Sequence, residues 1–420
     1  MSMSEWKEYR LGDVGKIVTG KTPKTAITDN YGGNIPFLSP SDNMELKYVP
    51  ITARHLTEKG LAEVKSCLIP ENSVCVSCIG SDMGKSVITV RPIVTNQQIN
   101  SIIPSSNFDT NFLYYILQNK KREIKFLGRN GTAVPILNKS AFSNLTILAP
   151  ELDEQRSIAS ILSSLDSKIE NNRKICANLE AQAQALFKHW FIDFAPFKDG
   201  KFVESELGMI PEGWRVGTYN DIIQETISGD WGKESLDGNY VHKVACIRGC
   251  DFQDVKMGLR GKTPERYILE KNFQSKRFED KDVLVEISGG TATVSTGRIC
   301  PISQLLIDKY NGDIICTNFC RLVRPHKGYS SYLYYSWKYK YDKKVMFGYE
   351  NGTSGIKNFS IKDFTTREPL VLPTLTALNE FEGMIEHIHT QIQNCGSESS
   401  KLAVIRDTLL PKLMSGEIKV

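Results

Sequence analysis

Two long stretches of the chain carry apolar residues at alternating steps of four and three. The first seam runs through residues 151–195 and consists of Ile158, Leu162, Leu165, Ile169, Asn172, Cys176, Leu179, Ala183, Leu186 and Trp190. The second runs through residues 373–420 and consists of Leu378, Phe381, Ile385, Ile388, Ile392, Cys395, Ser399 and Leu402. A period of about 3.5 residues is typical of coiled-coil helices. Because a long helix must bury its apolar stripe, we expect the two helices to pack antiparallel on each other.

The two seams differ in detail. No Pro or Gly interrupts the first, so about 40 residues of helix would span roughly 60 Å. Asn172 is its one polar seam residue, of the kind that fixes register in coiled coils. Gly383 and Gly396 are expected to weaken the second helix locally. At residues 394–397 the straightness of that helix is in question.

Before each seam the pattern is mixed. Short β-branched runs at 73–80, 85–90, 282–288 and 292–299 predict strands, and 112–127 and 332–347 predict helices. Pro and Gly punctuation at 196–213 predicts a linker. We therefore expect an α+β chain with this division: a first domain at 1–150, a helix at 151–195, the linker at 196–213, a second domain at 214–372 and a helix at 373–420.

The two predicted domains repeat each other. Seven matches occur in the same order, at an offset that drifts from 208 to 223 residues as loop insertions would make it drift: Trp6 with Trp214, Ile35 with Val244, Pro70 with Glu279, Thr95 with Thr317, Phe112 with Tyr332, Gly131 with Gly352, and Ala149 with Leu372. A fixed-period repeat is the signature of a duplicated structural unit. We therefore expect two similar mixed α/β domains, each followed by a long helix.

Composition narrows the class of protein. The 420 residues are 40% apolar and 24% charged, which is ordinary for a soluble globular chain. A net charge of +4 is far from the strongly basic balance of a freestanding DNA-binding domain. We expect no signal peptide and no transmembrane helix, hence a cytoplasmic protein with reduced thiols. The pairs Cys75/Cys78, Cys246/Cys250 and Cys316/Cys320 lie in apolar, strand-like runs, which favours buried thiols over a zinc site.

The stretch from Gly80 to Ser86 resembles a phosphate-binding loop. The P-loop motif needs four residues between its glycines and a helix after its Lys-Ser/Thr pair. Here Gly80 and Gly84 enclose one residue too few, and a strand-like run follows. The repeated copy, 287–299, keeps glycines and places Arg298 where the first copy has Lys85. We therefore predict a strand–loop–strand with a basic residue near the turn, able to reach a phosphate.

Other catalytic chemistry is not visible in the sequence. We find no adenine-methyltransferase tetrapeptide, no Pro-Asp before an E-x-K nuclease core, and none of HExxH, GxSxG or GxGxxG. His387 and His389 lie two apart on a predicted helix and would point to different faces. We predict no catalytic residue and no metal ligand.

The arrangement resembles the specificity subunits of type I restriction–modification systems. The likeness rests on the domain ends at 128–150 and 349–373, the helix segments at 152–174 and 185–194, the C-terminal segment at 405–418 and the opening WKEYRLGDVGKIVTGKTPKT. It covers nearly the whole chain, and the helices are its specific part.

The resemblance implies a non-catalytic subunit that recognises a bipartite, asymmetric double-stranded DNA target, with one half-site for each domain. Two methyltransferase subunits would grip the helices, and motor–nuclease subunits would join for cleavage. S-adenosylmethionine, ATP and Mg would bind to those partners and not to this chain. A helical spacer between two readers would set the distance between half-sites, at about 34 Å for each turn of DNA.

Candidate DNA contacts are polar residues on loops at matched positions of the two copies. In the first domain they are Lys21, Thr22, Lys24, Ser39, Ser41, Ser81, Lys85, Arg129, Asn130 and Thr132. In the second they are Trp231, Lys233, Arg248, Arg298, Asn351, Thr353, Ser354 and Lys357. Arg and Lys can read guanine or hold phosphate, and Asn can read adenine. The alternative for each is a solvated loop residue. The pairs Tyr114/Tyr115 and Tyr334/Tyr335 are better explained as core than as base-stacking residues.

Partner docking has its own candidates, and other functions remain open. Lys188, Trp190, Phe191 and Leu409 could dock partner subunits, and packing of the helix pair explains them equally well. A coiled-coil scaffold that binds only proteins would explain the helices but not two mixed domains with basic Gly/Asn loops. An enzyme with divergent motifs would bind S-adenosylmethionine or ATP without partners.

Overall fold

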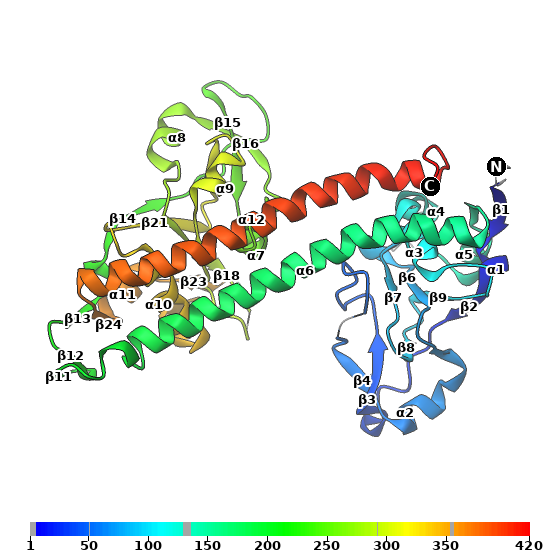
Figure 1. The fold of residues 1–420 in the computed structure, drawn as a ribbon, viewed down its shortest axis with the longest axis horizontal. Helices are drawn as coiled ribbons and strands as arrows, with labels where there is room; N and C mark the ends of the chain where they lie inside the picture. Colours follow the sequence, from blue (N-terminus) through cyan, green and yellow to red (C-terminus); the bar gives the residue numbers. More distant parts are fainter. Residues whose placement is uncertain (1–5, 50, 129–135, 292, 353–356) are drawn as a thin grey trace. The chain divides into compact units, whose positions relative to one another are not determined.

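The computed structural model describes residues 6–49, 51–128, 136–291, 293–352 and 357–420. The chain divides into two compact units (Figure 1). The first contains residues 1–167 and 402–420, and the second contains residues 168–401. Each unit thus holds one of the predicted domains together with a part of each predicted long helix.

Two four-stranded sheets form the body of the first unit. The antiparallel sheet has the order β2-β9-β6-β7, with β2 at Gly15–Thr19, β6 at Val74–Ser77, β7 at Ser86–Ile88 and β9 at Ile99–Pro104. The mixed sheet has the order β4-β3-β8-β5, with β3 at Tyr31–Leu38, β4 at Arg54–Leu56, β5 at Leu68–Ile69 and β8 at Ile93–Thr95. Strands β3 and β8 are parallel. A separate pair joins β1, Lys7–Arg10, to β10, Thr146–Ala149.

The second unit repeats this topology. Its antiparallel sheet is β14-β21-β17-β19, with β14 at Ile223–Ser228, β17 at Val283–Glu286, β19 at Ile299–Pro301 and β21 at Cys320–Pro325. Its mixed sheet is β16-β15-β20, with β15 at Tyr240–Ile247, β16 at Glu265–Leu269 and β20 at Ile314–Cys316, and β15 is again parallel to β20. The pair β13, Arg215–Thr218, and β24, Pro369–Leu372, corresponds to β1 and β10. The strand order therefore confirms the internal repeat.

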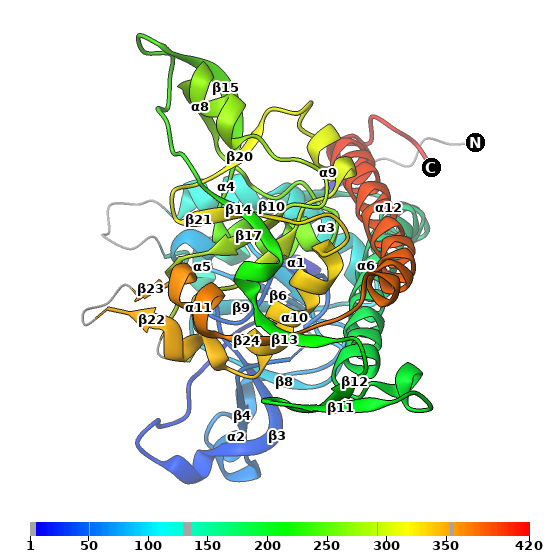
Figure 2. The ribbon, with the colours of Figure 1, turned by 90° about the vertical axis from the view of Figure 1, so that its left-hand side faces the viewer.

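Short helices complete each unit. The first has α1 Leu11–Val14, α2 Glu58–Glu63, α3 Thr110–Asn119, α4 Lys121–Leu127 and α5 Lys139–Ser143. The second has α7 Phe252–Lys256, α8 Glu270–Lys276, α9 Gln304–Asp308, α10 Ser330–Asp342 and α11 Ile361–Arg367. Side-chain caps explain several starts, such as Asp109, which accepts from the Phe112 amide at the start of α3. Figure 2 shows α8 beside β15, and α8 also packs against β16.

The two long helices form as predicted. Helix α6 runs from Leu152 to Phe191 and α12 from Leu375 to Met414. They are antiparallel neighbours: Asp166 pairs with Arg406 in the first unit, and Cys176 Sγ donates to Ile392 O in the second. Helix α12 continues without a break through residues 394–397. Gly396 lies there because a Cβ at this position would collide with the Met257 carbonyl.

A tyrosine pair anchors each domain to the long helices. Tyr114 and Tyr115 on α3, and Tyr334 and Tyr335 on α10, are buried, which confirms their prediction as core residues. Tyr115 donates to Asp166 on α6 at 2.5 Å. In the second unit the hydroxyls of Tyr334 and Tyr335 each lie 3.1 Å from a carboxylate oxygen of Glu180 on α6. These hydrogen bonds fix the domain helices against the coiled coil.

The strand prediction at 292–299 was wrong. Among the described residues of that run, 293–299, only Ile299 lies in a strand, at the start of β19. The hydroxyl of Thr291 accepts from the amides of Thr293 and Val294, which turns the chain instead of extending it. Local side-chain hydrogen bonds of this kind compete with strand pairing and override β propensity.

The segment expected to be a linker has a structure of its own. It contains a hairpin of β11, Phe202–Ser205, and β12, Gly208–Pro211. Phe197 packs edge-on against Trp190 and Trp214, with ring centroids 5.6 and 4.9 Å apart. These aromatic contacts explain why the segment is ordered despite its Pro and Gly residues. A small sheet of β18 Ser288–Gly289, β22 Glu350–Asn351 and β23 Lys357–Phe359 is also present in the second unit.

The cysteines are free thiols. Burial is confirmed for Cys75, Cys78, Cys246, Cys316 and Cys320, whereas Cys250 is exposed on the turn before α7. Desolvation raises the pKa of Cys75 to about 12 and that of Cys78 to about 11, so both stay protonated at neutral pH. Within the described ranges, no group of three or more His, Cys, Asp or Glu is placed to hold a metal ion. No helix in those ranges is long and apolar enough to cross a membrane.

Candidate nucleic-acid interface

A strand–turn–strand in the first domain presents Lys85. Strands β6 and β7 pair antiparallel, and a single 3-10 turn at Gly80–Asp82 lies between them. The Ser77 amide donates to the Lys85 carbonyl at 2.9 Å, and the Gly84 amide donates to the Ser77 carbonyl at 2.8 Å. Gly84 has φ of +83°, a conformation that favours glycine. The loop is therefore a hairpin turn followed by a strand, as predicted, and not a P-loop.

The second domain builds the same hairpin around Arg298. The Glu286 amide donates to the Arg298 carbonyl at 2.9 Å, and the Gly297 amide donates to the Glu286 carbonyl at 2.9 Å. Gly297 has φ of +85°. Arg298 thus stands where Lys85 stands in the first domain, and Glu286 stands where Ser77 does.

Each hairpin borders a second candidate segment. In the first domain Ile79 forms an antiparallel bridge with Ile136. In the second, β18 pairs with β23, and Lys357 Nζ lies 2.9 Å from Glu350 Oε2. The exposed Asn351 lies on β22, which pairs with β23. Five candidates lie outside the described residues: Arg129, Asn130, Thr132, Thr353 and Ser354.

Four candidates of the first domain, Lys21, Thr22, Ser39 and Ser41, lie where the parallel strands β3 and β8 end. The Lys21 amide donates to the Thr95 carbonyl at 2.9 Å, and Thr22 Oγ1 donates to Gln97 Oε1 at 2.6 Å. Ser39 is buried, and its amide and hydroxyl both donate to Asp42. Ser39 therefore shapes the turn, while the neighbouring Ser41 is exposed.

Two further candidates of the first domain are surface residues. The side chain of Lys24 is exposed, and its amide donates to Glu63 Oε2 at 3.0 Å. Ser81 is exposed on the turn between β6 and β7.

Arg248 in the second domain corresponds to Ser39. Its amide donates to Asp251 Oδ2 at 3.0 Å, which repeats the Ser39–Asp42 turn. Its guanidinium also binds Asp251 through Nε and Nη2, at 3.0 and 3.1 Å. The next residue, Gly249, lies against the Glu286 carboxylate, so Arg248 and Arg298 lie on adjoining loops.

Trp231 and Lys233 belong to a different part of the second domain. The Arg266 guanidinium lies over the Trp231 ring, 3.9 Å from its centroid. Lys233 bridges to Tyr267 on β16 and pairs with Asp237. These two residues therefore lie beside the β16 edge of the β16-β15-β20 sheet and not beside the Arg298 hairpin.

Lys85 and Arg298 are each held by carboxylates of their own domain. Lys85 Nζ lies 2.6 Å from Asp82 Oδ1 and 2.9 Å from Glu45 Oε1. Hydrogen bonds to these carboxylates raise the pKa of Lys85, and the hydrogen bond to Glu286 raises that of Arg298. Both side chains are therefore fully charged at neutral pH. The neighbouring carboxylates also weaken the electrostatic attraction of these side chains for a phosphate.

The four docking candidates have different surroundings. Phe191 is buried among aromatic residues, where it packs the helix pair and is closed to a partner. Trp190 and Leu409 are partly buried against the two cores. Lys188 is exposed, with Nζ 2.7 Å from Asp193 Oδ2. Trp190, Leu409 and Lys188 stay predictions as docking residues.

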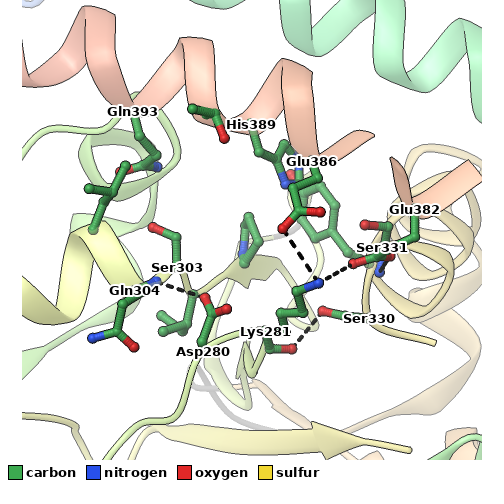
Figure 3. A pocket seen from close by; sticks show the side chains of 15 residues that line it. Asp280, Lys281, Ser303, Gln304, Ser330, Ser331, Glu382, Glu386, His389 and Gln393 are labelled. Carbon is green, nitrogen blue, oxygen red and sulfur yellow. Dashed lines mark hydrogen bonds and ion pairs between the residues drawn. The ribbon is translucent and has the colours of Figure 1, made fainter. Parts of the chain in front are cut away.

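A pocket with several charged residues in its lining lies in the second unit between α12 and the starts of α9 and α10 (Figure 3). Lys281 Nζ lies 3.3 Å from Glu382 and 3.7 Å from Glu386. His389 Nε2 lies 2.8 Å from the Tyr335 hydroxyl, and burial lowers the pKa of this histidine. The pocket therefore combines one lysine, several carboxylates and an imidazole that is neutral at neutral pH.

The sequence interpretation missed the carboxylates that hold the candidates. Asp42 lies three residues after Ser39, and Asp251 lies three residues after Arg248. The internal repeat therefore contained the information needed to predict these two carboxylates. Glu286 had no such signal, because its counterpart is Ser77. Asp166, Glu180 and His389 were read only as positions on helices.

Comparisons with known proteins agree with the fold. Residues 3–181 match the family described as type I restriction modification DNA specificity domain. The chain is 28% identical to the type I restriction enzyme MjaIX specificity subunit of Methanocaldococcus jannaschii, over 99% of this chain and 94% of that one. It is 35% identical to the HindI specificity subunit of Haemophilus influenzae, over 40% of this chain and 38% of the relative.

A solved structure shows the same fold. The crystal structure of the type I restriction–modification S subunit from M. genitalium superposes with a TM-score of 0.54 at 17% identity, covering 98% of this chain and 97% of that one. Over residues 3–181 the chain is similar to the DNA specificity domain of type I restriction modification systems, and over nearly its whole length it is similar to a type I restriction enzyme specificity subunit.

Proposed function

We propose that this chain recognises a bipartite, asymmetric sequence of double-stranded DNA, with one half-site for each domain. The carrying observation is that one hairpin frame is built twice with a different basic side chain in the same place. Lys85 in the first domain and Arg298 in the second follow a left-handed glycine, and their carbonyls accept equivalent hydrogen bonds. Two hairpins with the same backbone and different basic side chains are what we expect of two domains that recognise different DNA sequences. Base contacts specify and phosphate contacts position, so both kinds are expected.

The long helices are proposed to hold the partner subunits. Two methyltransferase subunits would bind along α6 and α12, and motor–nuclease subunits would join that complex. S-adenosylmethionine, ATP and Mg would be bound by the partners, in the cytoplasm, and this chain would contribute no catalytic group. The modest net charge of +4 supports a reader that gains part of its affinity from other subunits.

Exchange of one domain tests this proposal. Residues 1–150 are replaced by the equivalent region of a relative, and the methylated motif is mapped in cells that carry the hybrid with its methyltransferase. We expect one half of the motif to change while the other half stays. A change in both halves, or in neither, would contradict the modular proposal. Assembly of the complex without any sequence preference for DNA would favour a protein scaffold instead.

A further inference from the structure

Arg298 and Arg324 each bind a buried carboxylate through Nε and Nη2, as Arg248 does, but these two arginines differ in which guanidinium nitrogens are left without a partner. Arg324 donates through Nε and Nη2 to Asp282, at 2.9 and 3.0 Å. Its Nη1 lies 2.6 Å from Glu225 and 3.3 Å from Glu279. All three guanidinium nitrogens are engaged, and the side chain is 16% exposed. Arg324 therefore serves the structure of the domain.

Arg298 keeps one edge of its guanidinium open. Its Nε donates to Glu286 Oε2 at 2.7 Å, and its Nη2 donates to Glu286 Oε1 at 2.5 Å. Among the residues that the structure describes, Nη1 has no hydrogen-bond acceptor within reach. The side chain is 39% exposed. The Nη1 and outer Nη2 hydrogens thus form a free pair of donors at the surface.

The surroundings of Glu286 hold this edge in place. The Glu286 side chain is only 7% exposed and lies between two glycines, because a Cβ on Gly249 would collide with it and one on Gly289 would come within 3.2 Å. The residue is also the cross-strand partner of Arg298. A carboxylate fixed on both sides fixes the plane of the guanidinium that binds it. Such a fork loses little conformational entropy when it binds a second planar acceptor.

We propose that Arg298, held by Glu286, reads a guanine in the half-site of the second domain through its Nη1 and Nη2 edge. This inference rests on the proposed function. Guanine presents two acceptors, N7 and O6, side by side in the major groove, and an arginine fork matches both. Lys85 takes the same position in the first domain but has no fork, and two carboxylates hold its ammonium. The two half-sites therefore differ in chemistry at equivalent positions. Glu286 is a positioning residue, because it acts through Arg298.

The test uses this chain assembled with its methyltransferase subunits and duplexes that carry the methylated motif. Each base pair of the motif is changed in turn, and binding is measured for the wild type, Arg298→Ala, Arg298→Lys and Glu286→Gln. We expect Arg298→Ala to weaken binding to the intact motif by about 5- to 150-fold and to remove discrimination at one G·C pair of the second half-site only. Arg298→Lys keeps the charge but lacks the planar fork and its fixed orientation, so it should discriminate at this pair more weakly than the wild type. Glu286→Gln should weaken it partly.

Control variants and outcomes keep the inference separate from the proposed function. Arg215→Ala removes an exposed arginine of β13 that pairs with Asp221 on the turn directly after that strand, and it should leave every position unchanged. Thermal melting of each variant complex checks that folding is intact. Arg298→Ala could instead weaken binding to every duplex by the same factor and lower the slope of log K against log salt by about one. Arg298 would then be a contact to a DNA phosphate, and the inference would be overturned. Unchanged binding would overturn it too. Failure of the wild-type complex to discriminate any base would instead count against the proposed function.

Discussion

Lys85 and Arg298 occupy the same backbone position in the two domains. Each follows a glycine with φ near +84°, and each offers its carbonyl to an amide on the facing strand at 2.9 Å. The repeat thus preserves the frame and changes the side chain. A duplicated fold can recognise an asymmetric target in this way, because the two copies present different side chains from the same backbone position.

The two helix glycines of α12 should respond to substitution in opposite ways. Gly383 is exposed and has open space where a Cβ would lie, so Gly383→Ala should stabilise the chain by about 0.5–1 kcal/mol through helix propensity. A Cβ at Gly396 would collide with the Met257 carbonyl, so Gly396→Ala should destabilise by about 1–3 kcal/mol. Denaturant unfolding of the purified variants measures both. Equal effects of the two substitutions would contradict this account of α12.

Asn172 is a polar residue in the apolar seam of the helix pair. Its Nδ2 donates to Glu398 at 2.7 Å, but its buried Oδ1 has no partner among the described residues. We expect Asn172→Leu to leave stability unchanged or to raise it by about 1 kcal/mol, because an unsatisfied buried oxygen is removed. The adjacent, exposed Asn171→Leu is the matched control and should give no gain. A large loss for Asn172→Leu would show that its hydrogen bond outweighs the unpaired oxygen.

Asp166 joins the first domain to both helices. It accepts from the Tyr115 hydroxyl at 2.5 Å and from Arg406 Nη1 at 2.8 Å. Asp166→Ala leaves a partly buried guanidinium without this partner, and we expect a loss of about 2–3 kcal/mol in unfolding free energy. Asp407→Ala removes an exposed carboxylate from the same arginine, and it should cost well under 1 kcal/mol. Similar losses for both variants would argue against the anchoring role of Asp166.

His389 should make stability depend on pH. Burial lowers its pKa in the folded chain below the ordinary value of 6.5, against the opposing influence of Glu180 and Glu382. Well above pH 6.5 the imidazole is neutral in both states, so it contributes no pH dependence there. As the pH falls below 6.5, the unfolded chain binds the proton more readily, and stability should fall.

Melting temperatures measured between pH 7.5 and 5.5 test this expectation. The decline should be smaller in His389→Gln than in the wild type. The exposed His189→Gln should behave as the wild type does. An identical decline in His389→Gln would assign the pH dependence to other groups.

Periodicity and repetition predicted much of the fold. The heptad steps located α6 and α12, because a long helix must bury its stripe whatever it binds. The matched pairs Trp6/Trp214 and Phe112/Tyr332 located equivalent elements, since the two copies share one topology. Lys85 and Arg298 were recognised as basic residues near equivalent turns for the same reason.

Tertiary contacts decided what the sequence did not show. Residues 292–299 have strand-forming side chains, but the Thr291 hydroxyl turns the chain there. Phe197 orders a segment that Pro and Gly marked as a linker. The pairing of Arg298 with Glu286 depends on strand register, which residue types do not reveal.

Mapping of methylated bases in the source cell, with and without the gene for this chain, tests the central claim most directly. The account predicts that one split, asymmetric methylated motif disappears with the gene and that all other methylation remains. It also predicts at least one G·C pair in the half-site of the second domain. If, in cells that express the complete complex, the methylated motifs are the same with and without this chain, its assignment as the reader of a bipartite DNA target is contradicted.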